Sequence, residues 1–132
     1  MSEKGLLTDE QREMLDSLAE LIIPEDDFDQ GLKGSGFSGI IETKNIYQPW
    51  LADVYEIGLE GIQKISQTFF GKNFLDLGND ERGSVLDALA SDEHVGDVWT
   101  ENVTGPIFYT TLRQDACFVY STDEDVWDRI GF

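Results

Sequence analysis

The run from Pro49 to Gly71, PWLADVYEIGLEGIQKISQTFFG, constrains the fold of this chain more than any other feature. Its apolar residues recur every three or four positions, which is the period of an α-helix with one buried face. Gly71 follows the last of them, where glycine commonly ends a helix. The predicted face consists of Leu51, Val54, Tyr55, Leu59, Ile62, Ile65 and Phe69. The run therefore predicts a long amphipathic helix that covers a hydrophobic core.

A second helix is predicted in TDEQREMLDSLAELIIP, near the start of the chain. Thr8 can cap its first turn, and Gln11 stands three residues later, at the reciprocal position of a capping box. Pro24 ends the apolar run.

The remaining sequence also has a mostly helical pattern. We expect a short helix from about Ser38 to Tyr47, another that Asn79 caps, and helical structure over 92–119 with a kink or a fresh start at Pro106. No run has the two-residue period of a strand, apart from the ambiguous CFVY. The prediction is an all-α, single-domain bundle of about five helices over 1–132, with an acidic and glycine-rich loop at 25–38. Its predicted core contains Leu18, Ile22, Leu51, Val54, Ile62, Phe69, Leu86 and Leu89.

The chain is strongly acidic, with 27 acidic and 9 basic residues and a formal net charge of −18. Such a field repels nucleic acid and anionic membranes, because no cationic patch can displace their counterions. The chain as given shows neither an export signal nor a long apolar segment. We therefore expect a soluble, cytoplasmic protein, or an extracytoplasmic one if it is exported with a partner.

Side chains suited to catalysis are scarce. The only histidine, His94, has no nucleophile visibly paired with it, so a surface position is favoured over a general base. Cys117 lies beside Phe118 and Val119 and is interpreted as a small buried hydrophobe rather than a reactive thiol. We expect neither a catalytic residue nor a cofactor or metal site in this chain.

Two loop patterns resemble ligand sites, but one fails on spacing and the other on its structural context. The acidic cluster at 25–29 lacks the glycine and the glutamate that a calcium-binding EF-hand loop needs at its sixth and twelfth positions. The fragment GSGFSG matches a dinucleotide-binding fingerprint, but it does not follow a strand. A solvated acidic loop and a flexible linker are the favoured interpretations.

Three stretches together resemble the gluconate 2-dehydrogenase subunit 3 family. These are LTDEQREMLDSLAELIIPEDD, GLEGIQKISQTFFGKNFLDLGNDERGSVLDALA and FVYSTDEDVWDRIGF. The resemblance implies a small, non-catalytic accessory subunit that binds and stabilises a large flavin-dependent sugar or alcohol oxidoreductase. FAD would then belong to the partner subunit. The alternative is a stand-alone acidic interaction or regulatory domain unrelated to redox enzymes.

The chain departs from the family's pattern at two points. The family usually has a Tyr-Gly-Gly-Asn-type loop before the closing tryptophan, where this chain has only TDEDV. Many members also begin with a twin-arginine signal, which is absent here. The departures put in question a contact made by that loop and a role in export.

Aromatic residues near the C-terminus suggest where a partner would bind. An obligate interface is apolar at its centre and rich in aromatic residues and arginine. The predicted partner-facing residues are Phe108, Tyr109, Arg113, Tyr120, Trp127, Arg129 and Phe132. The alternative is that the segment is only the last core helix, with Trp127 closing the monomer's own core.

Overall fold

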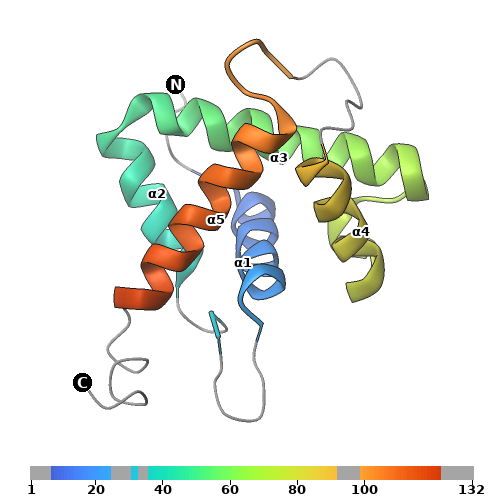
Figure 1. The fold of residues 1–132 in the computed structure, drawn as a ribbon, viewed down its shortest axis with the longest axis horizontal. Coiled ribbons are helices and arrows are strands. Elements are labelled where there is room, and N and C mark those ends of the chain that lie inside the picture. The colour runs from blue at the N-terminus through green and yellow to red at the C-terminus, as the bar shows by residue number, and fades with distance from the viewer. Residues whose placement is uncertain (1–6, 25–30, 33–35, 92–98, 123–132) are drawn as a thin grey trace.

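The computed structural model describes residues 7–24, 31–32, 36–91 and 99–122, and these form a bundle of α-helices (Figure 1). The five α-helices are α1 (Asp9–Ile22), α2 (Phe37–Tyr47), α3 (Pro49–Phe70), α4 (Asn79–Ala90) and α5 (Gly105–Thr122), with a 3₁₀ turn, η1 (Phe74–Asp76), before α4. No strand occurs within the described ranges, and CFVY lies inside α5. The predicted all-α fold is confirmed.

The helix ends follow from local hydrogen bonding. Thr8 and Gln11 form the predicted capping box, in which the Gln11 N–H donates to Thr8 Oγ1 at 3.1 Å and the Thr8 N–H donates to Gln11 Oε1 at 2.9 Å. Gly71 ends α3 with φ 68°, a left-handed conformation that favours glycine. Asn79 is not the cap of α4: Gly78 occupies that position, and its N–H donates to Glu81 Oε1 at 3.1 Å.

The segment before α5 differs from the prediction. Residues 99–104 form no helix, because Thr100 and Val103 instead exchange backbone hydrogen bonds of 3.1 and 3.3 Å. Helix α5 begins only at Gly105, with Pro106 at its second position, where a missing N–H costs no helical hydrogen bond. Pro106 therefore marks a fresh start and not a kink.

Helix α1 lies at the centre of the bundle (Figure 1). It packs against α2 on one side, α4 on the other and α5 in front, while α3 crosses one end and contacts α2, α4 and α5. The buried core includes Leu18, Leu51, Val54, Ile62, Leu86 and Leu89, as predicted. Ile22 is only partly buried and packs against this core.

Two predicted burials are wrong. Phe69 is 43% exposed, because it lies in the last turn of α3, where the neighbouring helices leave part of its ring uncovered. The rings of Phe69 and Phe70 lie edge to face, with their centroids 6.5 Å apart. Cys117 is exposed as well, since it lies on the side of α5 away from the core that Leu112, Ala116 and Val119 enter. Periodicity locates a buried face, but it does not say how far neighbouring helices extend over it.

Candidate partner interface

The acidic residues are unevenly distributed over the helices. Helix α1 carries five acidic residues and one basic residue, and α3 and α4 each carry three acidic residues and one basic residue. By contrast, α2 and α5 each contain one acidic and one basic residue, and the stretch from Asn45 to Ala52 contains no charge. The region of α2, the α2–α3 turn and α5 is therefore close to neutral in a chain of net charge −18.

A cluster of three polar side chains joins α2, α3 and α5. Asp115 of α5 accepts a hydrogen bond from Tyr55 Oη at 2.5 Å and from Lys44 Nζ at 2.5 Å. Asp115 is 8% exposed and Tyr55 is fully buried. Burial, and then the Asp115 carboxylate, raise the pKa of the Tyr55 hydroxyl far above its ordinary value, so that Tyr55 stays a neutral donor. The cluster fixes the relative positions of the three helices.

Exposed apolar side chains lie on the three helices that this cluster joins. On α2, Ile40 and Tyr47 lie one turn before and one turn after Lys44, on the same face of the helix. On α5, Ile107 and Phe118 share a stripe with Thr111 at i, i+4 and i+11. We call the following set the junction face: Ile40 (37% exposed), Tyr47 (81%), Trp50 (65%), Ile107 (40%) and Phe118 (57%).

Phe118 is directly tied to the polar cluster. The ammonium group of Lys44 lies 5.6 Å from the centroid of its ring, within the range of a cation–π interaction. The same ammonium group contacts Asp115. The junction face is thus apolar, with an internally neutralised ion pair beside it.

The residues predicted from sequence to face a partner have different positions. Phe108 is fully buried against Tyr55, with the ring centroids 5.7 Å apart, so it belongs to the core and to no surface of the folded chain. Tyr109 and Tyr120 are partly buried against the same core, and Arg113 is exposed. Trp127, Arg129 and Phe132 lie outside the described residues.

Tyr109 and Arg113 come together on another side of α5. With Cys117 they line a shallow depression of about 380 Å³. The structure therefore brings two of the predicted residues together, while the junction face lies on a different stripe of the helix. Sequence reasoning missed Tyr47 and Trp50, although the charge-free stretch NIYQPW around a helix–helix turn was a signal that could have indicated them.

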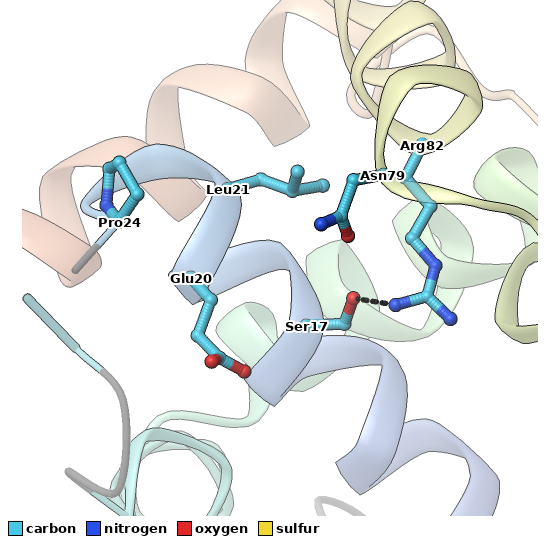
Figure 2. Close-up of a pocket in the computed structure, with 6 residues that line it drawn as sticks. All are labelled: Ser17, Glu20, Leu21, Pro24, Asn79 and Arg82. Atoms are coloured by element: carbon cyan, nitrogen blue, oxygen red, sulfur yellow. Dashed lines mark hydrogen bonds between the residues drawn. The ribbon is translucent and has the colours of Figure 1, made fainter. Parts of the chain in front are cut away.

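A larger hollow, of about 480 Å³, separates the end of α1 from the start of α4 (Figure 2). Arg82 reaches across it and donates to Ser17 Oγ at 2.8 Å and to the Leu75 carbonyl oxygen at 2.7 Å. The central carbon of its guanidinium group also lies 5.4 Å from the centroid of the Phe74 ring. These contacts give Arg82 a structural role, since they hold the segment before α4 against α1. The lining residues are Ser17, Glu20, Leu21, Pro24, Asn79 and Arg82.

Two further candidate sites from the sequence lie outside the described residues. They are His94 and the acidic cluster at 25–29. In the part of the chain that is described, no three histidine, cysteine, aspartate or glutamate side chains are grouped so that they could hold a metal ion. None of the helices described is both long enough and apolar enough to cross a membrane.

Comparison with known proteins gives one match. No curated protein and no solved structure matches the chain. Residues 9–132 match the family described as gluconate 2-dehydrogenase subunit 3, in agreement with the resemblance of the three sequence stretches. Because the match covers nearly the whole chain, the protein belongs to the gluconate 2-dehydrogenase subunit 3 family.

Proposed function

We propose that this chain is a non-catalytic accessory subunit that binds and stabilises a large FAD-dependent sugar or alcohol oxidoreductase. The family is named for the third subunit of such a dehydrogenase, which supports a role within a multi-subunit enzyme. In this proposal the flavin and the redox chemistry belong to the large subunit. The complex acts in the cytoplasm, or outside it if the large subunit is exported together with this chain.

The observation that carries the proposal is the neutral, aromatic surface of an otherwise acidic protein. Depletion of charged residues and enrichment in Tyr, Trp and Phe distinguish the centre of a protein interface from the rest of a protein surface. The junction face has this composition, with Tyr47 and Trp50 more than half exposed. A catalytic site would instead bring activated polar groups together in a cleft.

Co-expression with an FAD-dependent sugar or alcohol oxidoreductase from the same organism tests the proposal. We expect a tag on this chain to retain the flavoprotein, and flavin absorbance to coincide with both chains in size-exclusion chromatography. The large subunit should also melt at a lower temperature when it is purified alone, because binding to the folded state stabilises it. Separate elution of the two chains, with an unchanged melting temperature of the flavoprotein, would exclude this function.

A further inference from the structure

We propose that the junction face is the docking surface for the large subunit, and that it meets an apolar patch flanked by basic side chains. This inference rests on the proposed function and adds the location of the contact and the chemistry of the surface that it fits. It differs from the sequence-based prediction, which centred on Phe108 and the C-terminal tail. The junction face is instead made by residues from α2, α3 and α5 that lie far apart in the sequence.

Exposure is the first argument. Tyr47, Trp50 and Phe118 are 81%, 65% and 57% exposed, and they come from the three helices that the Lys44–Asp115–Tyr55 cluster joins. Clustered exposed apolar residues indicate an interaction site, whereas single ones need no explanation. Tryptophan and tyrosine are also the residues most often found at the energetic centre of an interface.

Charge is the second argument. A desolvated unpaired carboxylate at the centre of an interface would cost several kcal/mol, so the centre must exclude most of the charge that this chain carries. The acidic residue that α5 contributes beside this face, Asp115, is already paired with Lys44 at 2.5 Å. Glu42 of α2 is paired as well, with Arg12 at 2.8 Å and with the Leu7 N–H at 2.8 Å. The carboxylates that α2 and α5 contribute near the face are therefore already neutralised.

Rigidity is the third argument. The Lys44–Asp115–Tyr55 cluster ties α2, α3 and α5 together, and Lys44 holds the ring of Phe118 from one side. Side chains that are ordered before binding lose less conformational entropy in the complex, which favours affinity. The cluster thus positions Phe118 directly and fixes the relative positions of the helices that carry Tyr47 and Trp50.

The charge that the partner would present at the edge of the contact follows from the exposed side of α3. Its solvent side carries Glu56 and Glu60, which lie about one turn apart and are both exposed. Like charges opposite this stripe would repel, while lysine and arginine would be attracted and would speed association. The matching surface of the large subunit is therefore apolar at its centre and basic at the edge that meets α3.

The test measures the affinity of purified variants for the flavoprotein by titration. Trp50→Ala and Phe118→Ala should each raise Kd by about 10-fold or more, as expected for aromatic residues at the centre of an interface. Phe69→Ala is the matched control, because Phe69 is 43% exposed but lies in the last turn of α3, away from the cluster. It should change Kd less than about twofold, as a surface substitution outside the interface does.

Melting temperatures of the three variants separate binding from folding. Trp50→Ala should melt like the wild type, since its side chain is largely in water. Tyr47→Ala, which removes the most exposed of these residues, replaces Phe118→Ala if that variant unfolds. If the wild type binds the flavoprotein and both Trp50→Ala and Tyr47→Ala bind it with an unchanged Kd, the inference is overturned. The proposed function then remains intact.

Two further outcomes would also overturn it. One is a wild-type chain that forms a dimer which Trp50→Ala dissociates, with flavoprotein binding unaffected, because the face would then join two copies of this chain. The other is a Phe69→Ala variant that weakens binding as much as Trp50→Ala does. If the wild type binds no flavoprotein at all, the proposed function itself fails, and that result is distinct from the other two.

Discussion

At the scale of single residues, the buried carboxylate of Asp115 links three helices. Asp115 receives both of its hydrogen bonds from other helices, because Tyr55 belongs to α3 and Lys44 to α2. A buried ion pair contributes little net stability compared with apolar residues of similar size, but losing one member leaves the other unpaired. Asn45 differs, since its buried Oδ1 accepts no hydrogen bond from the residues that the structure describes.

Substitutions in the cluster should show that removing one member costs more than the ion pair contributes to net stability. Asp115→Ala should lower the free energy of unfolding by about 3 kcal/mol, because it strands the Tyr55 hydroxyl and removes the partner of Lys44. Tyr55→Phe should cost less, about 1–2 kcal/mol, since Asp115 keeps Lys44. Urea unfolding at neutral pH measures both. The account of the cluster fails if Asp115→Ala is as stable as the wild type.

At the scale of elements, glycine sets how closely α3 and α5 approach. A Cβ atom at Gly58 would lie 2.2 Å from the ring of Phe108, and one at Gly61 would lie 2.1 Å from the ring of Trp99. Phe108 is fully buried, so its ring has little room to move away. Gly58 therefore permits the packing of Phe108 that places α5 against α3, and Gly61 permits the packing of Trp99, which precedes α5.

A matched pair of alanine substitutions tests this packing. Gly58→Ala should destabilise the protein by about 1–3 kcal/mol, because overpacking of the Phe108 ring outweighs the gain in helix propensity. Gly83→Ala, in the middle of α4 with no atom within 4 Å of the added Cβ, should stabilise it by about 0.5–1 kcal/mol. Thermal unfolding compares the two. Stabilisation by both substitutions would show that the α3–α5 contact is looser than described.

The helices were largely predictable from sequence, because caps and periodicity are local signals. Thr8, Gln11 and Gly71 each mark a helix end through contacts within a few residues. The sequence does not show which neighbouring helix covers each predicted apolar face. Phe108 lies in the core although it was predicted to face a partner, and Phe69 is exposed although it was predicted to be buried. Both positions depend on how far the neighbouring helices extend, which is a tertiary property.

The same limit applies to the candidate interface. Tyr47 and Trp50 flank a turn, and Phe118 comes from a helix more than sixty residues later. The contacts of Asp115 with Lys44 and Tyr55 show that these segments share one region. Arg113 and Tyr109, which were predicted from sequence, lie together around Cys117, outside the junction face, and their contact with a partner stays a prediction.

At the scale of the whole molecule, the distribution of charge separates two kinds of surface. Helices α1 and α4 carry an excess of acidic residues, while α2, the α2–α3 turn and α5 are close to neutral. A net charge of −18 favours solubility of the free subunit, and the neutral region allows a desolvated contact. In the proposed complex, solubility and partner binding therefore belong to different faces of one small bundle.

Hydrogen–deuterium exchange of the free chain and of its complex with the flavoprotein tests this division most directly. The account predicts that slowed exchange on binding concentrates in α2, in the turn at 45–52 and in α5, where amides become shielded from solvent. Exchange in the solvent-facing turns of α1 and α4 should stay unchanged. Protection centred on α1 and α4, with the junction face exchanging as in the free chain, would contradict it.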